Sequence, residues 1–216
     1  MTLDAKLCTI KSGGQKVYVG RIVAVGKTDK PFVAYRVSSR SFPNRVARIT
    51  DVGAAIQPLD PEDMKRNPYI AYNCIRVSQR GVVVSNGSHT DPIFEKLESG
   101  TAPDLALQQV LTEMGYERDD YNTPRIAGIV TASVGFIGTV RADGIEISSF
   151  ELEDNSCHVI CTYEMDHVES KGYPFVASTA EEAAHYVVDG GVFKDLEQPI
   201  CAAAWMDELA VFNPHE

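Results

Sequence analysis

Long apolar runs are missing from this sequence. No stretch approaches the roughly 18 apolar residues that a membrane helix needs, and Met1 to Gly20 lacks the apolar core of a signal peptide. The five cysteines are odd in number and scattered, unlike those of a disulfide framework. We therefore expect a cytoplasmic protein with reduced thiols and no membrane partner.

Positive charge is also scarce. The 216 residues include 20 Lys and Arg against 30 Asp and Glu, which gives a formal net charge of −10 at pH 7. The field of such a protein repels nucleic acid and acidic membranes, so neither is an expected partner. A small anionic substrate stays compatible with this charge if a few arginines form a local positive pocket.

The sequence has neither a glycine-rich phosphate loop nor a paired metal-ligand motif. GxxxxGK[ST] and GxGxxG do not occur, which argues against a helix-capped nucleoside triphosphate or dinucleotide. Cys157, His158, Cys161 and His167 are close in sequence, but a zinc site usually has a second closely spaced ligand pair. We expect no metal and no cofactor, and we expect these thiols to be buried or strand-borne.

Hydrophobic residues make up 44% of the chain, enough for a large core. Chains of this length often form one domain, and no internal repeat, low-complexity tract or linker divides this one. We expect a single domain over residues 1–216. Its first sixteen residues are expected to form an extra strand or a frayed arm.

Strand patterns occupy most of the chain. Val17 to Val25 and Phe32 to Val37 alternate or run apolar with β-branched residues, and the turn composition between them predicts an opening hairpin. Asp143-Gly144 supplies a second hairpin turn. The other predicted strands are Val46 to Ile56, Ile70 to Val77, Val82 to Val84, Ile126 to Val130, Phe136 to Val140, Gly144 to Ser149 and Val159 to Tyr163.

Helical patterns are fewer and lie between groups of strands. Ala102 to Met114 has an apolar face, with Thr101 as its expected N-cap. A shorter helix is predicted over Pro92 to Glu98, and a third follows a capping box of Ser178 and Glu181.

The end of the chain, Cys201 to Phe212, is ambiguous between helix and strand, being Ala-rich at first and β-like later. Strands in runs with helices inserted between them predict an α+β fold. In that fold two antiparallel sheets pack together and the helices cover their outer faces.

Polar side chains gather in the segment VAYRVSSRSFPNR, Val33 to Arg45. Arg36, Arg40 and Arg45, with Ser39 and its neighbours, offer guanidinium forks and hydroxyls suited to a phosphate or carboxylate. A strand-end loop with solvated arginines explains the same residues, and the sequence alone favours neither interpretation.

A second polar segment is NPYIAYNCIR, Asn67 to Arg76. Strict alternation predicts that Tyr72 and Arg76 share one face of the strand and that Asn73 lies on the other. A Tyr hydroxyl can donate a proton or stabilise an oxyanion, and an Asn can hold an amide. The commoner alternative is a core Tyr whose hydroxyl binds a carbonyl.

Two further polar segments follow strands or helices. In Ser85 to Asp91, Asn86 and Gly87 predict a turn, and His89 is a candidate general base, although a helix-capping loop explains the segment equally well. Gly115 to Gly128 carries Glu117, Asn122 and Arg125. This segment is by default a solvated loop, but Arg125 directly precedes an apolar strand and is expected at the margin of a sheet.

Five ordered blocks give the chain a specific resemblance: YVGRIVAVG, PFVAYRVSSRSFPNR, RNPYIAYNCIR, VVSNGSHTD and NTPRIAG. Together they resemble the archaeal-type IMP cyclohydrolase family from Tyr18 onward. The resemblance implies a four-layer αββα sandwich like that of the N-terminal-nucleophile hydrolases, without self-processing, and a homo-oligomer. It leaves residues 1–16 as an extra N-terminal segment.

The resemblance also implies the last step of purine synthesis, in which a formamido-imidazole-carboxamide ribonucleotide closes to IMP with loss of water. Its partner is thus a small purine ribonucleotide. By similarity, Arg45, Tyr72 and Glu117 are expected at the reaction centre. Tyr72 would donate to the formyl oxygen, Glu117 would serve as base or proton relay, and Arg45 would stabilise charge.

Other residues are expected to contact the substrate. They are Ser39, Arg40, Asn73, Asn86, His89, Asn122 and Arg125. Two alternatives remain open at this point. One is an amidohydrolase that processes itself at Cys8, Thr9 or Cys74, and the other is a purine-nucleotide-binding protein without catalysis.

Overall fold

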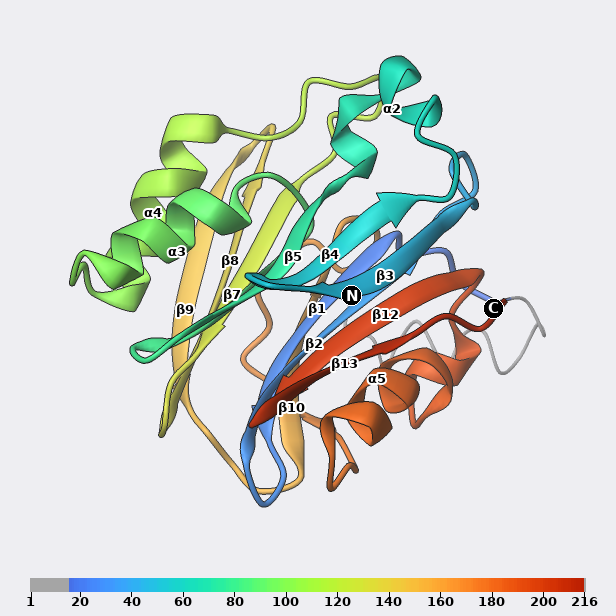
Figure 1. The fold of residues 1–216 in the computed structure, drawn as a ribbon. Helices are drawn as coiled ribbons and strands as arrows, with labels where there is room; N and C mark the ends of the chain where they lie inside the picture. The colour runs from blue at the N-terminus through green and yellow to red at the C-terminus, as the bar shows by residue number, and fades with distance from the viewer. Residues whose placement is uncertain (1–15, 216) are drawn as a thin grey trace.

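Two antiparallel β-sheets pack face to face in the structure, a computed structural model that describes residues 16–215 (Figure 1). One sheet has seven strands in the order β3-β4-β5-β6-β7-β8-β9, and the other has six in the order β11-β10-β1-β2-β12-β13. The chain is therefore an α+β protein, and the expectation of two antiparallel sheets is confirmed. The expected N-terminal addition, residues 1–16, lies outside the described residues except for Lys16.

The elements have the following bounds. The seven-stranded sheet consists of β3 (Arg45–Thr50), β4 (Gly53–Pro58), β5 (Tyr72–Ser78), β6 (Gly81–Ser85), β7 (Arg125–Val130), β8 (Val134–Arg141) and β9 (Gly144–Glu151). The six-stranded sheet consists of β1 (Arg21–Lys27), β2 (Pro31–Ser38), β10 (Ser156–Cys161), β11 (Tyr173–Pro174), β12 (Pro199–Met206) and β13 (Glu208–Phe212). The helices are α2 (Asp63–Arg66), α3 (Thr90–Glu98), α4 (Pro103–Met114) and α5 (Ala180–Asp189), with short turns η1 (Pro68–Ile70) and η2 (Phe193–Asp195).

Strand β1 is buried on both faces, which explains its continuous apolar sequence. Val23 and Val25 face the seven-stranded sheet, whereas Ile22 and Ala24 belong to the core under α5. The two sheets come very close at Gly128 of β7, because a Cβ there would lie 2.4 Å from Val25 Cγ2. A residue without a side chain is what allows this contact.

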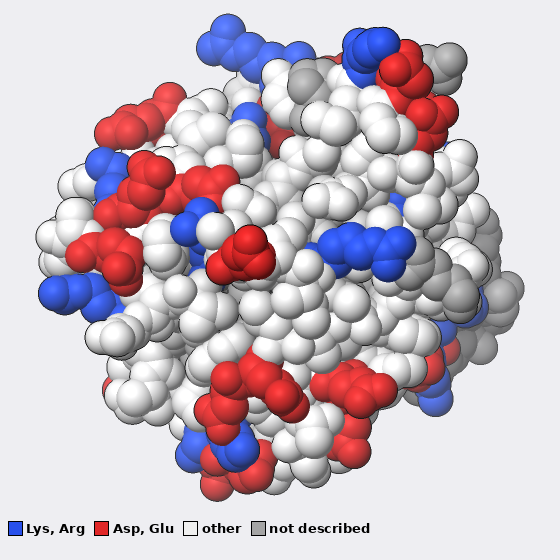
Figure 2. Space-filling model, in the orientation of Figure 1, with Lys and Arg blue, Asp and Glu red and all other residues white. Residues whose placement is uncertain are grey.

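Helices cover the outer faces of both sheets. Leu97 of α3 and Leu107 and Val110 of α4 pack on the seven-stranded sheet, and α5 packs on the six-stranded sheet (Figure 1). Within the described residues, no helix has both the length and the apolarity that crossing a membrane requires. Figure 2 shows acidic side chains over α3 and α4 and around α5, with Lys and Arg interspersed, so this face is mixed in charge.

Arg36 of β2 is a buried cation that holds the end of α5. Its guanidinium donates to the main-chain oxygens of Val187, Val188, Phe193, Leu196 and Glu197 over 2.9–3.4 Å. Carbonyls at a helix C-terminus have no partner within the helix, and Arg36 supplies one. The sequence grouped Arg36 with possible phosphate ligands, but its guanidinium is used by the fold.

A side chain from the C-terminal end closes the free edge of β3. The Asn213 amide accepts a hydrogen bond from the Ala47 N–H at 2.9 Å and donates to the Ala47 carbonyl at 3.2 Å. β3 is the outermost strand of its sheet, so these two main-chain groups have no strand partner on that side.

Two stretches contain more strands than expected. Val46 to Ile56, predicted as one strand, is a hairpin of β3 and β4. Cys201 to Phe212, left open between helix and strand, belongs to β12 and β13. Ala202 and Ala204 are buried under α5, so tertiary packing outweighs the preference of alanine for helices.

Two helices start one residue later than predicted. Ala102 rather than Thr101 occupies the N-cap of α4, without a side-chain hydrogen bond. At α5 the cap is Thr179, whose hydroxyl accepts from the Glu182 N–H at 3.2 Å. The predicted box of Ser178 and Glu181 has the same spacing of three, so the pattern alone does not choose between the two.

β5 contains a bulge at Cys74. Its register with β4 shifts there, because Ala55 pairs with Asn73 while Ala54 pairs with Ile75. A bulge adds one residue to one strand and interrupts the alternation of faces.

The bulge overturns the predicted sharing of faces in β5. Asn73 and Arg76 lie on the same side, and both donate to the carboxylate of Asp91 in α3. Tyr72 points instead into the core between the sheets. The expectation that Tyr72 and Arg76 share a face is therefore wrong.

The Cys and His residues considered as a metal cluster do not converge. Cys157 and Cys161 are buried in the core under α5. His158 stacks on an aromatic ring of β9, and His167 Nδ1 lies 2.8 Å from a carboxylate oxygen of Glu146. In residues 16–215, no three His, Cys, Asp or Glu side chains are placed to hold a metal ion.

Candidate active site

A cavity of about 530 Å³ opens where loops leading into strands of both sheets meet. This volume lies in the range of about 300–1,000 Å³ that small-molecule sites occupy. The cavity is lined by Tyr18, Arg21, Ser39, Arg40, Ser41, Phe42, Asn67, Tyr69, Glu117, Asp119, Asp120, Tyr121 and Tyr163.

Arg21, the first residue of β1, places a cation in the cavity wall. Its Nε atom is buried and has no hydrogen-bond partner. Its charge is near enough to interact with the side chains of Tyr72 and Glu117. An unpaired buried donor costs about 1–3 kcal/mol, so Arg21 is well placed to gain from a ligand oxygen.

Arg45, the first residue of β3, lies behind the cavity wall and is 2% exposed. Its Nε atom donates to the Phe42 carbonyl at 3.1 Å, but Nη1 and Nη2 are buried without partners. Burial lowers the pKa of the guanidinium, and the positive charge of Arg21 lowers it further. Arg45 thus keeps two donors that the protein itself does not use.

Tyr72 does not line this cavity. It is 8% exposed and borders a separate hollow of about 290 Å³, while its phenol is close enough to interact with the charges of Arg45 and Arg21. Its hydroxyl is 2.7 Å from the hydroxyl of Tyr35, and the two rings meet edge to face. Burial raises the pKa of Tyr72 above its ordinary value, and the charges of Arg45 and Arg21 oppose that rise. The phenol is therefore protonated at neutral pH while two cations stand ready to stabilise its anion.

Glu117 also lines the cavity, close enough to Arg21 for their charges to interact. Its carboxylate binds Arg125 Nη1 at 3.2 Å, and both side chains are buried. Burial raises the pKa of Glu117, although Arg125 and Arg21 pull it down. A carboxyl with a raised pKa is suited to accept and return a proton.

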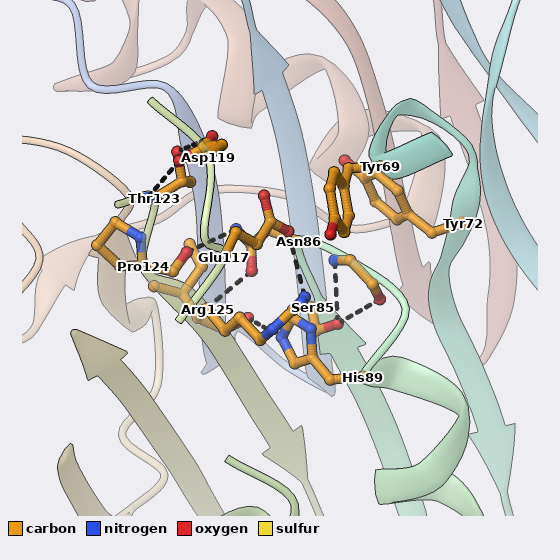
Figure 3. Close-up of polar contacts among 12 residues, drawn as sticks. Tyr69, Tyr72, Ser85, Asn86, His89, Glu117, Asp119, Thr123, Pro124 and Arg125 are labelled. Carbon is orange, nitrogen blue, oxygen red and sulfur yellow. Dashed lines mark hydrogen bonds and ion pairs between the residues drawn. The ribbon is translucent and has the colours of Figure 1, made fainter. Parts of the chain in front are cut away.

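His89 and Asn86 support this ion pair from below. His89 Nε2 donates to the Ile126 carbonyl at 3.0 Å. The other ring nitrogen, Nδ1, therefore carries the lone pair, and this buried atom has no hydrogen-bond partner. Asn86 accepts from the Ile126 N–H at 2.8 Å and donates to the Pro124 carbonyl at 3.0 Å. Figure 3 shows both residues beside Arg125 and Glu117, with Tyr69 and Tyr72 to one side.

Gly87 allows the ion pair to lie against the turn. A Cβ at Gly87 would be 3.1 Å from Glu117 Oε1, 3.2 Å from Arg125 Nη1 and 3.3 Å from His89 Nδ1. Three polar atoms thus converge on the space that a side chain would take. The Asn86-Gly87 turn expected from the sequence has this packing role as well.

Another wall of the cavity is aromatic. Tyr18 stacks on Tyr163, and the Arg40 guanidinium lies 4.4 Å from the Tyr18 ring centroid. Arg40 also pairs with Glu197 at 2.7 Å. The Tyr163 hydroxyl is 2.9 Å from the Thr123 hydroxyl, which ties this wall to the loop that carries Glu117.

The predicted substrate contacts are distributed unevenly. Ser39 and Arg40 line the cavity, whereas Arg125, Asn86 and His89 lie beneath it. Asn73 instead binds Asp91 at a separate hollow of about 290 Å³.

Asn122 does not line the cavity either. It is exposed and has a φ of 50° in the loop before β7.

Sequence reasoning missed several residues of the site, and the contacts of three of them are described above. Arg21, Tyr35 and Tyr163 lie inside apolar strand patterns or at a strand end, where each looks like ordinary core or margin. The only available signal for Arg21 was a charged residue within the otherwise apolar block YVGRIVAVG.

Comparison with known proteins assigns the chain to a family. Residues 18–210 match the model of a family described as IMP cyclohydrolase-like protein. The chain belongs to this family. The resemblance indicated by the five sequence blocks is thereby confirmed, and every residue lining the cavity of this IMP cyclohydrolase-like chain falls inside the match.

Relatives support the same assignment over nearly the full length. A protein of Methanocella arvoryzae named IMP cyclohydrolase is 44% identical over 91% of this chain and 98% of its own length. One of Methanothrix thermoacetophila with that name is 43% identical, covering 92% of this chain and 100% of its own length. A third, from Methanocaldococcus jannaschii, is 45% identical over 89% and 95% respectively.

Proposed function

We propose that this chain is an IMP cyclohydrolase, which closes 5-formamido-imidazole-4-carboxamide ribonucleotide to IMP with loss of water. The named relatives support this activity, because they are 43–45% identical over nearly the whole chain. The observation that carries the proposal is that Arg21 and Glu117 line one cavity of suitable size and that Tyr72 is close enough to interact with the charge of Arg21. A cation, a phenol and a carboxylate are the groups that ring closure needs.

In the first step, the carboxamide nitrogen attacks the formyl carbon of the same molecule. The site holds the two groups in a near-attack conformer. Glu117 takes one amide proton as the carbon–nitrogen bond forms, and Tyr72 gives its proton to the formyl oxygen. Arg21 and Arg45 stabilise the negative charge on that oxygen and on the phenolate.

In the second step, the carbinolamine loses water. The hydroxyl leaves with the proton that Glu117 holds, and the Tyr72 phenolate takes the proton of the former formamide nitrogen. The new carbon–nitrogen double bond completes the ring, and both residues regain their starting protonation states. The reaction uses no redox agent and no nucleoside triphosphate.

Substrate binding falls to the outer part of the cavity. Arg40, with Ser39 and Ser41, supplies donors for the phosphate, because it combines a guanidinium with nearby hydroxyls. Asn86 and His89 are bonded to the main chain below the cavity, so in our proposal they position Arg125 and Glu117 rather than touch the nucleotide. Asn73 and Asn122 have no role in the proposed chemistry.

Two variants test the assignment of Tyr72 and Glu117. We expect Tyr72→Phe and Glu117→Gln each to lower kcat by about 100-fold or more while changing KM much less, because each group acts on the reacting atoms. Hypoxanthine absorbance from the formamido ribonucleotide measures turnover. Matched controls are Tyr173→Phe, a buried tyrosine bonded to Glu169 far from the cavity, and Glu113→Gln on the exposed face of α4. Normal turnover in both active-site variants would refute the roles.

The same assay separates this activity from the two alternatives. A nucleotide-binding protein without catalysis would bind the substrate and form no hypoxanthine. A self-processing amidohydrolase would show a shortened chain by mass spectrometry. Of its candidate nucleophiles, Cys8 and Thr9 lie outside the described residues, and Cys74 is buried with a pKa raised well above that of a free thiol.

The order of helix and sheet layers bears on the type of fold. We infer that residues 18–210 form one αββα domain of the type found in N-terminal-nucleophile hydrolases, used here without self-cleavage. We also propose a homo-oligomer, as the family resemblance implies. Light scattering on the eluting protein measures its mass, and a mass of 23.6 kDa would contradict self-association.

A further inference from the structure

The hydroxyls of Tyr35 and Tyr72 form a hydrogen bond of 2.7 Å in which either oxygen could be the donor. Tyr35 is a β2 residue with no exposed surface, whereas Tyr72 keeps 8%. Each phenol has one proton to donate, so counting acceptors decides the direction.

Consider first the arrangement in which Tyr72 donates to Tyr35. The proton of Tyr35 then needs a different acceptor, and the described residues provide none, because Tyr72 is the only hydrogen-bond partner of the Tyr35 hydroxyl. A buried donor without an acceptor costs about 1–3 kcal/mol. This arrangement is disfavoured.

In the opposite arrangement, Tyr35 donates to Tyr72, so the hydroxyl of Tyr35, the residue with no exposed surface, is satisfied. The proton of Tyr72 then points away from Tyr35, and Tyr72 is the residue of the pair that keeps some exposed surface. It has no acceptor among residues 16–215, so it is available to a ligand oxygen.

We propose that Tyr35 is a positioning residue that directs the proton of Tyr72 toward the substrate oxygen. When Tyr72 gives up this proton, its O–H bond breaks, and the hydrogen bond from Tyr35 stabilises the phenolate that remains. Tyr35 keeps its own proton throughout. This inference rests on the proposed cyclohydrolase function and adds a residue that contacts neither substrate nor cavity.

The charges near the pair act in the same direction. Arg21 from β1 and Arg45 from β3 both interact favourably with a phenolate at Tyr72. With Tyr35 from β2 as hydrogen-bond donor, three strands of the two sheets converge on one oxygen. Such an arrangement is fixed before the substrate binds, which is the condition for electrostatic preorganisation.

Kinetics of Tyr35→Phe give the first test. We expect kcat to fall roughly tenfold with KM unchanged, because one hydrogen bond to the developing anion is lost while the cavity lining stays intact. Tyr173→Phe removes a hydroxyl from an equally buried tyrosine under α5 and should leave both constants unchanged. Equal kcat in Tyr35→Phe and wild type would overturn the proposal.

Spectroscopy gives a second test that needs neither substrate nor activity. In protein labelled with ¹³C at tyrosine Cζ, the buried hydroxyl proton of this pair should correlate with Tyr35 Cζ, identified by its loss in Tyr35→Phe. Correlation with Tyr72 Cζ would overturn the inference even if the cyclohydrolase assay succeeds. Conversely, absence of wild-type turnover would refute the proposed function and leave this measurement valid.

Stability of Tyr72→Phe covers the case in which Tyr35→Phe fails to fold. Tyr72→Phe removes the sole acceptor of the Tyr35 hydroxyl, whose proton is then buried without a hydrogen-bond partner. The urea midpoint of Tyr72→Phe should therefore fall further than that of Tyr173→Phe. A wild-type midpoint would count against Tyr35 as the donor.

Discussion

Burial shifts the ionisation of both Glu117 and His89 toward their neutral forms. Loss of water raises the pKa of Glu117, and Arg125 and Arg21 only partly reverse this. The same loss of water lowers the pKa of His89 to about 3, with the nearby charge of Arg125 acting in the same direction. The protonation of the site is therefore a property of its surroundings, and pH can test it.

Activity should depend on the raised pKa of Glu117. The base must be deprotonated to accept the amide proton, so kcat/KM should fall as pH drops through a value above 4.5, the ordinary pKa of Glu. In Arg21→Gln the acid limb should move to still higher pH, because a charge favouring the carboxylate is gone. Arg40→Gln, at the outer cavity, should raise KM without moving the limb. An acid limb at or below 4.5 would contradict this assignment.

Folding stability should depend on the lowered pKa of His89. The unfolded chain takes up a proton near pH 6.5 and the folded chain only near pH 3, so stability present above pH 6.5 is lost as pH falls toward 3. His89→Gln retains a donor for the Ile126 carbonyl and does not titrate. Its urea unfolding free energy should vary less than that of the wild type between pH 7.5 and 5, by about 1–2 kcal/mol. Parallel pH curves for the two proteins would contradict this.

At the scale of single elements, α5 depends on one arginine of the sheet beneath it. Arg36→Met keeps much of the apolar bulk and removes the guanidinium hydrogen bonds to five carbonyl oxygens. We expect a loss of about 3–5 kcal/mol in urea unfolding, typical of breaking a buried charged network. Arg40→Met, which breaks an exposed ion pair, should lower the unfolding free energy much less. Similar losses in the two variants would contradict the role given to Arg36.

The contrast between Arg36 and Arg45 marks a limit of sequence reasoning. Both arginines lie in one segment and alternate with apolar residues. The pattern could therefore group them, but it could not say which guanidinium is hydrogen-bonded within the fold. Arg36 finds its carbonyls about 150 residues later in the chain, a separation of 151–161 positions. The bulge at Cys74 is a similar case, because it depends on the register with β4 and not on the residues of β5 alone.

At the scale of the whole molecule, the two sheets approach each other closely at Gly128. Gly128→Ala would place a Cβ 2.4 Å from Val25 Cγ2, and overpacking of this kind costs about 1–3 kcal/mol. Gly138→Ala on the neighbouring strand is a matched control. The two nearest atoms to its Cβ would be side-chain carbons, Leu111 Cδ1 at 3.0 Å and Ile147 Cγ1 at 3.3 Å, so the contact is less severe than at Gly128. We expect Gly128→Ala to lower the urea midpoint clearly more than Gly138→Ala, and the reverse order would contradict the close contact.

The fold class could be predicted from the sequence because it follows from local periodicity. The predicted strands are present with shifted ends, except that Val46 to Ile56 is a hairpin of two strands, and α3, α4 and α5 are all found. The order of strands was not within reach, since β12 pairs with β2 over more than 160 positions. Arg45, Tyr72 and Glu117 came from family resemblance, whereas Tyr35 joins the site through the packing of one sheet on the other, where its hydroxyl meets that of Tyr72.

The amide of Asn213 at the rim of the seven-stranded sheet has a consequence for solubility. An open strand edge is a template on which another chain can add its own strand, and this is how native sheets aggregate. By binding both main-chain groups of Ala47, Asn213 occupies the place that an invading strand would take. Asn213 therefore protects the strand that begins with Arg45 against edge-to-edge self-assembly.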